Sequence, residues 1–218
     1  MNELLTGLNG GSVPALDMII TLTLVALLPS IVVMMTSFTR IIIILSFTRT
    51  AMGAQQNPPN MVLTGIALFL TLYIMSPVIS EIQQTAYDPY VRGEISQQEA
   101  VSRLEDPMKR FMLRNTEKTT LDRFVEMSGT QVRDNVEEYP LTVVTPAFMT
   151  SELKKGFLAG FLLYLPFLLI DVVVATTLMS MGMVMLPPTM IAMPFKLLLF
   201  VTVDGWELLF SAIVSNFR

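Results

Sequence analysis

Six charged side chains lie within or beside strongly apolar runs of this 218-residue sequence, and they are the first candidates for chemistry. They are Arg40, Arg49, Glu152, Asp171, Lys196 and Asp204. A charge inside a membrane-crossing helix is costly unless it is paired or meets water, so such residues are functional candidates by default. These six side chains therefore either form buried or inter-subunit ion pairs that fix helix packing, or take part in proton or ion transfer.

Asp171 and Asp204 are spaced symmetrically about a proline pair. Each lies 16 residues from the nearer of Pro187 and Pro188, so a hairpin that turns at these prolines places both carboxylates at one depth. Two such carboxylates could share a proton, as in an intramembrane aspartyl protease. However, Asp204 follows Val201-Thr-Val without a Gly-x-Gly pattern, and no Tyr precedes Asp171. The sequence therefore argues against a protease.

Lys196 is the only basic residue between these two aspartates in the sequence. It lies only 8 residues beyond Pro188, which leaves it about 12 Å from Asp171 along a hairpin turning at the prolines. Pairing within one chain is therefore expected to be strained, whereas a staggered neighbouring copy could supply the carboxylate. This spacing suggests an oligomer. A small-ion channel or transporter subunit that uses Asp171, Lys196 and Asp204 as an ion path is the alternative.

A run of alternating methionines precedes the proline pair. Six of the 17 methionines fall within 15 residues, at Met179, Met181, Met183, Met185, Met190 and Met193. A period of two does not make one helical stripe, and Gly182 weakens a helix, so the run predicts an irregular loop. At membrane depth such a loop must be buried in protein or line a cavity. Because methionine adapts to many shapes, the loop either fills a core or closes a pore around variable cargo.

The overall composition excludes many kinds of active site. The chain has no Cys and no His, which removes thiol nucleophiles, disulfides, Ser-His-Asp triads and imidazole-held haem or zinc. Its net charge of −4 argues against nucleic acid as a partner. No Gly-x-x-x-x-Gly-Lys-Ser/Thr loop for nucleotide phosphates is present. We therefore expect no enzyme activity, no cofactor, no metal and no nucleic-acid partner.

Four apolar runs are long enough to cross a bilayer, which takes about 20 residues. They cover 16–35, 62–82, 157–179 and 190–214, and the first resumes at 41–45 beyond Arg40. No basic segment precedes the first run, so we expect it to be retained rather than removed as a signal peptide. The runs predict an all-α membrane protein with a hydrophobic hairpin at 1–82 and another at 151–218.

The segment between the hairpins, 83–150, has the composition of a small helical polar insertion. Of the 32 charged side chains, 20 lie between Glu81 and Glu138. These mixed-sign charges form either a solvated face or a surface for a partner. Arg40 and Arg49 place the connection between the first two runs in the cytoplasm, so the insertion and both termini are expected on the extracytoplasmic side.

Helix signals inside the insertion predict where its helices begin and end. Ser96 with Glu99 forms a capping box, and the helix that follows should kink or split at Pro107. Thr119 with Asp122 predicts a second helix start. That second helix should end at Ser128-Gly129.

Several motifs stand in a fixed order outside the insertion. They are Ser37-Phe-Thr-Arg40, Gln55-Gln-Asn-Pro-Pro-Asn60, Ser151-Glu-Leu-Lys154, Tyr164-Leu-Pro-Phe-Leu-Leu-Ile-Asp171, Met181-Gly-Met-Val-Met-Leu-Pro-Pro188, Pro194-Phe-Lys-Leu-Leu-Leu-Phe200 and Val203-Asp-Gly-Trp206. Together they resemble the FliP family of flagellar type III export-gate proteins and its injectisome counterpart, SctR. The first motif and the C-terminal Ser215-Asn-Phe217 favour the flagellar branch.

The resemblance implies a non-enzymatic channel subunit of long kinked hairpins in the bacterial inner membrane, within the flagellar basal body. About five copies would assemble with FliQ and FliR, joined by FlhB, and pass unfolded flagellar substrates. The assembled complex would sit largely above the bilayer plane, with apolar surfaces partly buried against partner subunits.

The resemblance also assigns roles to particular residues. Met181, Met183 and Met185 match a gasket around the pore, although Val184 interrupts the consecutive methionines that are common in the family. Glu152 and Lys196 match an inter-subunit ion pair.

Overall fold

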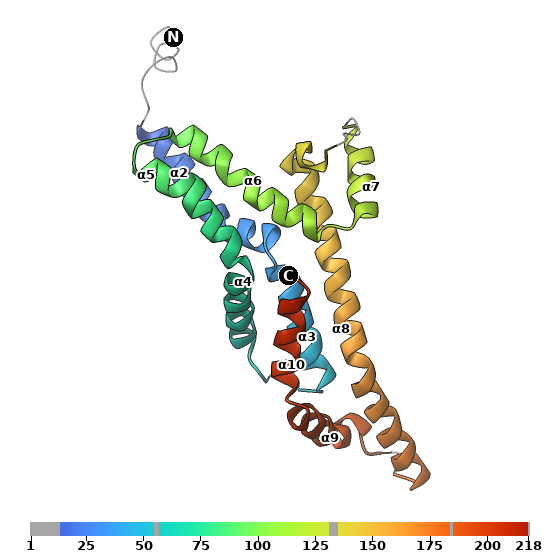
Figure 1. Ribbon diagram of the computed structural model, residues 1–218. Helices are drawn as coiled ribbons and strands as arrows, with labels where there is room; N and C mark the ends of the chain where they lie inside the picture. The colour runs from blue at the N-terminus through green and yellow to red at the C-terminus, as the bar shows by residue number, and fades with distance from the viewer. Residues whose placement is uncertain (1–13, 55–56, 131–134, 184, 218) are drawn as a thin grey trace, which may run out of the picture.

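The computed structural model describes residues 14–54, 57–130, 135–183 and 185–217. These residues form helices and turns and contain no strand, so the predicted all-α class is confirmed. The molecule is elongated, with the helices of the insertion at one end and α9 near the other (Figure 1). Residues 1–13, where a leader would lie, are outside the described residues.

The first apolar run is bent. α2 (Pro14–Met35) and α3 (Phe38–Ala51) meet at an angle of 69°. At this corner the Thr39 hydroxyl donates to the carbonyl of Val33 at 2.7 Å, and thereby ties the start of α3 to the end of α2. Two residues separate the helices, and the second of them, Ser37, is fully buried.

The second run forms α4 (Asn60–Ile82), which passes through a π-helical turn (Gln83–Tyr87) into α5 (Asp88–Val91). Pro89 has no N–H, so it cannot bond the carbonyl of Thr85 one turn earlier. Arg103 of the insertion donates to that carbonyl instead, with Nη1 3.4 Å from the oxygen. The insertion is therefore attached to the π-helical turn after α4, at the carbonyl for which Pro89 supplies no donor.

The insertion contains α6 (Gln97–Asn115), α7 (Lys118–Ser128) and a short 3₁₀ turn (Val136–Glu138). The predicted helix start at Ser96 is confirmed, since Ser96 Oγ accepts from the N–H of Glu99 at 3.2 Å. The Glu99 carboxylate pairs with Arg103. Of the expected kink or split at Pro107, the split is wrong, because α6 runs through this buried proline as one helix. The kink stays a prediction. The expected start at Thr119 is also wrong, because Glu117 is the N-cap of α7.

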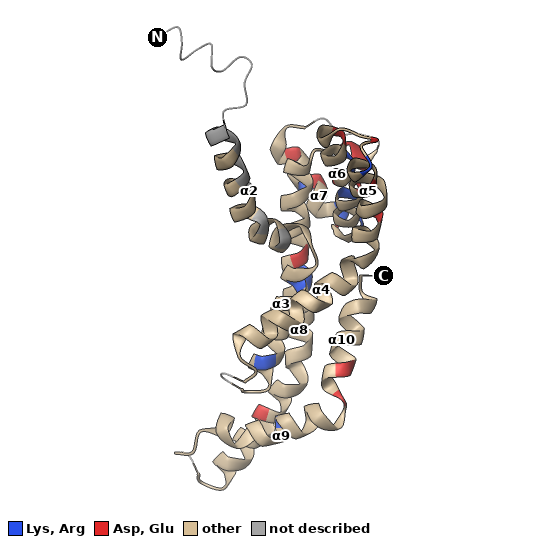
Figure 2. Cartoon of the chain, turned by 90° about the vertical axis from the view of Figure 1, so that its left-hand side faces the viewer, with Lys and Arg blue, Asp and Glu red and all other residues tan. Residues whose placement is uncertain are grey.

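The charged side chains are concentrated at the end of the molecule formed by α5, α6 and α7 (Figure 2). The helices of the remaining length carry few charges, as the four apolar runs predict. α7 ends as expected at Gly129, which adopts a left-handed conformation with φ 65°. The charged part of the sequence thus forms one end of the molecule, and the apolar part forms the remaining length.

α8 (Leu141–Ser180) is a single helix of 40 residues that packs along α3. Two glycines one turn apart, Gly156 and Gly160, bring the backbones close, as small residues do between helices in membranes. A Cβ on Gly160 would lie 2.6 Å from Phe47 Cγ, and one on Gly156 would lie 3.3 Å from Ile43. The proposed boundary at 150/151 falls inside α8, so it marks a change of composition and no break in the helix.

The last run forms α9 (Pro188–Thr202) and α10 (Gly205–Ser215), which meet at 63°. Asp204 at the corner has a left-handed backbone with φ 51°. Trp206 packs edge-on against Phe200, with ring centroids 5.1 Å apart. Gly205 permits this, because a Cβ there would lie 2.5 Å from the Phe200 ring.

Within the described residues, two helices are long and apolar enough to cross a membrane, Asn60–Val91 and Leu141–Ser180. The number rises to four if each bent pair, α2 with α3 and α9 with α10, counts as one span. The four predicted hydrophobic segments fall on these helices.

Candidate functional site: buried ion pairs and the methionine loop

Arg40 of α3 and Glu152 of α8 form a buried two-point ion pair. Arg40 Nε donates to Glu152 Oε2 at 2.9 Å, and Arg40 Nη2 donates to Glu152 Oε1. The side chains are 3% and 0% exposed. Planar guanidinium and carboxylate groups match in this arrangement, which satisfies both charges where water is absent.

Arg40 also binds the C-terminal end of α10. Its Nη1 donates to Asn216 Oδ1 at 3.3 Å, and its Cζ lies 3.8 Å from the ring centroid of Phe217. A guanidinium over an aromatic face is attracted by the ring quadrupole. One side chain therefore joins α3, α8 and the end of the chain that the structure describes.

Lys196 of α9 and Asp171 of α8 form a second pair within the chain. Lys196 Nζ lies 2.6 Å from Asp171 Oδ2, and the side chains are 4% and 20% exposed. The prediction that pairing within one chain would be strained is wrong, because the hairpin does not turn at the prolines. α8 ends at Ser180 and turns at Gly182, whose φ is 76°. Asp171 and Lys196 lie 25 residues apart, on opposite sides of that earlier turn.

Pro187 and Pro188 begin α9 and do not end α8. Pro187 is the N-cap of α9 and Pro188 its first residue. Proline is well tolerated there because the first N–H groups of a helix have no intrahelical partner. The predicted break in the helix is present, but it is made by Gly182, five residues before the prolines. Gly182 donates to the carbonyl of Met179 at 3.0 Å, and Met183 donates to that of Leu178 at 3.0 Å.

Glu152 and Lys196 each have a counter-ion in their own chain, so neither needs a second copy for neutralisation. The inter-subunit pair between them stays a prediction. Asp204 is not a buried charge in this structure. Its side chain is exposed at the α9–α10 corner, outside the α8–α9 hairpin that contains Asp171.

Arg49 is half-buried at the end of α3, where it holds the connection to α4. Its Nη1 donates to Asn60 Oδ1 at 2.5 Å and to the carbonyl of Pro58 at 3.3 Å. Both acceptors are neutral. Arg49 thus has a structural role in the turn.

The alternating methionines occupy the tip of the α8–α9 hairpin. Met181 lies in the turn, and Met183 and Met185 lie before α9, which confirms the predicted loop for these three residues. Met179 belongs to α8. Met181 is 63% exposed and Met185 is 97% exposed in the single chain. Val184 is outside the described residues. The thioethers are therefore free to contact another molecule.

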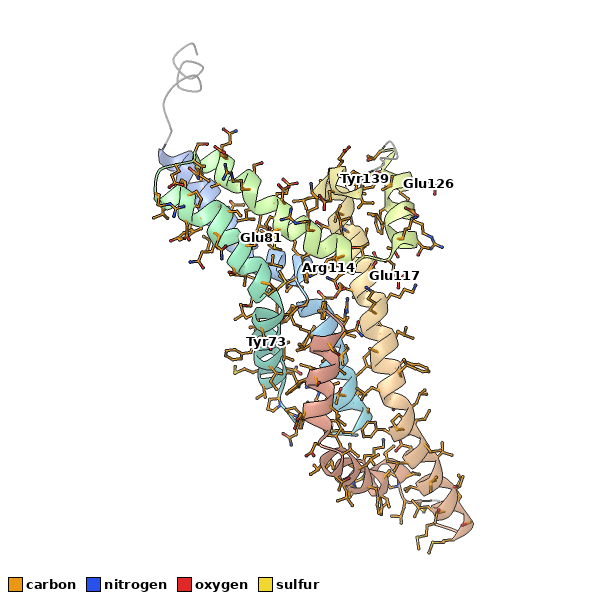
Figure 3. All side chains as sticks on the ribbon, viewed as in Figure 1. Tyr73, Glu81, Arg114, Glu117, Glu126 and Tyr139 are labelled. Atoms are coloured by element: carbon orange, nitrogen blue, oxygen red, sulfur yellow. The ribbon has the colours of Figure 1, made fainter. Side chains whose placement is uncertain are left out.

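One turn of α8 holds the connection between α6 and α7, which the sequence reasoning missed. Ser151 Oγ accepts from the N–H of Glu117 at 3.1 Å, and Lys155 Nζ donates to the carbonyl of Asn115 at 2.6 Å. Lys154 Nζ lies 2.6 Å from Glu117 Oε2, and Figure 3 labels Glu117 at this junction beside α8. The Ser151-Glu-Leu-Lys154 motif was the available signal, since its polar residues face both the insertion and Arg40.

The described residues contain no group of three or more carboxylates placed to hold a metal ion. The candidate site therefore consists of two ion pairs, Arg40–Glu152 and Lys196–Asp171, and of the methionine loop at the tip of the α8–α9 hairpin.

Comparison with known proteins decides the family. The model of the FliP family matches residues 21–213, nearly the whole of this arrangement. The chain belongs to the FliP family. The flagellar biosynthetic protein FliP of Bacillus subtilis is 47% identical over 200 residues, which cover 92% of this chain and 90% of that protein. FliP of Aquifex aeolicus is 47% identical over 213 residues, covering 96% and 89%. FliP of Caulobacter vibrioides is 48% identical over 197 residues, covering 90% and 74%.

FliP family membership agrees with the resemblance seen in the motifs. The match includes both ion pairs and the methionine loop, so these features lie within the part of the chain shared with the family. All three relatives carry the name flagellar biosynthetic protein.

Proposed function

We propose that this chain is a pore-forming subunit of the flagellar type III protein export gate. It passes unfolded flagellar substrates across the bacterial inner membrane, within the basal body, and its methionine loop seals the closed pore. The observation that carries this proposal is the exposed loop of Met181, Met183 and Met185 at the tip of a hairpin in a FliP-family chain. Flexible thioethers can pack against one another across an axis without a fixed geometry.

The uncovered apolar surface supports assembly with further subunits. In the most apolar 18-residue stretch of α8 only 11% of the residues are buried inside the chain, and in that of the helix Asn60–Val91 the share is 33%. Surfaces of this kind must face lipid or protein. We propose about five copies, together with FliQ, FliR and FlhB-type proteins, as the partners that cover them.

The gate acts without covalent chemistry, cofactor or metal. Its role is mechanical, since the paired charges hold helices and the loop opens and closes. A small-ion path through Asp171, Lys196 and Asp204 is less well supported: the first two are paired with each other at 2.6 Å, and Asp204 lies apart at the α9–α10 corner.

The particle mass of the complex extracted in detergent tests the proposal. We expect a multi-subunit ring that co-purifies with two other hydrophobic proteins. A lone chain that conducts ions after reconstitution without partners would contradict the export gate and favour the ion channel.

A further inference from the structure

A cavity of about 1060 Å³ lies between the α3–α4 connection and one face of α9. We call it the Arg49 cavity. Its wall on the side of the connection is polar and includes Arg49, Thr50 and Asn57. Its wall on the side of α9 is mainly apolar, and the apolar residues share one helical face and are exposed in the single chain: Met190, Met193 and Leu197. The cavity thus opens between a cationic wall and an apolar wall.

Arg49 presents a hydrogen-bonding edge that no described residue uses. Its two acceptors, Asn60 Oδ1 and the carbonyl of Pro58, both accept from Nη1, which leaves Nε and Nη2 without a described partner. In Arg40 the same edge holds the Glu152 carboxylate at two points. Guanidinium groups bind carboxylates in this way. No described carboxylate lines the cavity, so the edge of Arg49 is open to a carboxylate from another chain.

Two carboxylates at the α9–α10 corner lack a cation among the described residues. They are Asp204 and Glu207, and both side chains are exposed. Val203 and Leu208, their neighbours in the sequence, are 45% and 60% exposed. The corner therefore combines anionic with apolar groups, which is the complement of the two walls of the Arg49 cavity.

The acidic corner and the Arg49 cavity lie on different sides of the molecule. In Figure 2 the end of α3 and the start of α10 lie on opposite sides of α8, at a similar height. Copies related by rotation about an axis along the molecule join unlike surfaces at one height, and such head-to-tail contacts can close into rings. These two surfaces are therefore placed to meet between neighbouring copies.

We propose that the Arg49 cavity binds the α9–α10 corner of a second copy of this chain. Arg49 donates through Nε and Nη2 to the second copy's Glu207, and the second copy's Leu208 packs against Met190 and Met193. Glu207 suits this contact better than Asp204, because its side chain is longer by one methylene and exposed Leu208 follows it directly. The inference rests on the proposed assembly of several copies and adds the residues of one contact.

Disulfide cross-linking in the detergent-extracted complex tests the contact, since the chain has no cysteine of its own. Thr50→Cys combined with Leu208→Cys places one thiol on the cavity wall and the other beside Glu207. We expect oxidation to give a ladder of cross-linked copies on a non-reducing gel. The control is Met127→Cys combined with Leu208→Cys, which should give no ladder, because Met127 is exposed on α7 at the polar end of the molecule.

Charge reversal in the Thr50→Cys, Leu208→Cys chain tests the ion pair. Glu207→Lys should lower the yield of the ladder about tenfold, equivalent to about 1.4 kcal/mol, because two cations would then face each other. Adding Arg49→Glu should restore the yield. Glu207 is exposed, so Glu207→Lys alone remains decisive where Arg49→Glu disturbs the turn.

The matched control for the charge reversal is Asp204→Asn. Asparagine also adopts the left-handed backbone of this position, so the substitution removes a neighbouring negative charge and preserves the corner. It should leave the yield of the ladder unchanged.

Three results would overturn the proposal. The first is the absence of a ladder in a complex whose particle mass contains several copies, which would leave the proposed export gate standing without this contact. The second is a ladder that Glu207→Lys does not lower. The third is capture of a different subunit, and of no second copy, by a photoreactive maleimide on Thr50→Cys. A particle mass of a single chain would overturn the proposed function as well.

Discussion

Arg40 and Glu152 lie 112 residues apart in the chain and meet in a two-point ion pair that solvent barely reaches. Removing one partner of such a pair leaves the other charge buried and uncompensated. The cost is typically about 3–5 kcal/mol.

Glu152→Gln should therefore lower the free energy of unfolding by about 3–5 kcal/mol, measured by denaturant titration in detergent. The control is Glu99→Gln, which removes an exposed pair with Arg103 and should cost less than about 1 kcal/mol. Equal losses in the two variants would show that the Arg40–Glu152 pair contributes no more than a surface contact.

Lys196→Glu should impair folding and assembly, because it places two carboxylates together at Asp171. Adding Asp171→Lys should partly restore both, since the pair is then reversed within the same hairpin. The amount of complex recovered by size-exclusion chromatography measures the rescue. Rescue by Glu152→Lys, with none by Asp171→Lys, would instead support the inter-subunit pair.

Gly160→Ala should destabilise the contact between α3 and α8, because the new Cβ would lie 2.6 Å from Phe47 Cγ. Overpacking of this kind costs about 1–3 kcal/mol, visible as a lower melting temperature in detergent. Gly65→Ala is the matched control, since nothing lies within 4 Å of its new Cβ. Phe47→Ala removes Cγ, the atom nearest to the new Cβ; if it fails to relieve Gly160→Ala, the steric explanation is incorrect.

The triple variant Met181→Ala, Met183→Ala and Met185→Ala should assemble normally and leak. These side chains are exposed in the single chain, so their loss removes bulk at the loop without opening the helical core. Membrane conductance or small-solute uptake, measured beside complex recovery, checks this expectation. A variant as tight as the wild type would make the methionines packing residues.

The helices could be predicted from sequence because their signals are local. Apolar runs gave the four hydrophobic segments, and Ser96 with Glu99 gave the start of α6. The turn of the second hairpin was misplaced because a proline pair resembles a helix end, whereas proline is equally suited to a helix start. Gly182, with its positive φ, was the better signal for the turn.

The candidate site could be predicted only as a set of residues. The charges inside apolar runs pointed to Arg40, Glu152, Asp171 and Lys196. Sequence spacing misjudged the pair of Asp171 and Lys196 because the turn was misplaced, and it could not pair Arg40 with Glu152, which lies 112 residues away. The start of α7 was missed for the same reason, since Glu117 is held by Ser151 of α8. Long-range partners decide such positions, and no local pattern records them.

The length of α8 enlarges the effect of small changes in its tilt. Its 40 residues span about 60 Å, and the distance from Gly160 to Ser180 is about 30 Å. The polar insertion binds the part of α8 before Gly160, through Ser151 and Lys155, and the methionine loop follows the other end of the helix. A tilt of α8 by about 5° at the glycine contact would move the loop sideways by roughly 3 Å, because the loop lies about 30 Å from that contact. The position of the methionine loop is therefore more sensitive to the tilt of α8 than the position of any residue nearer to the glycine contact.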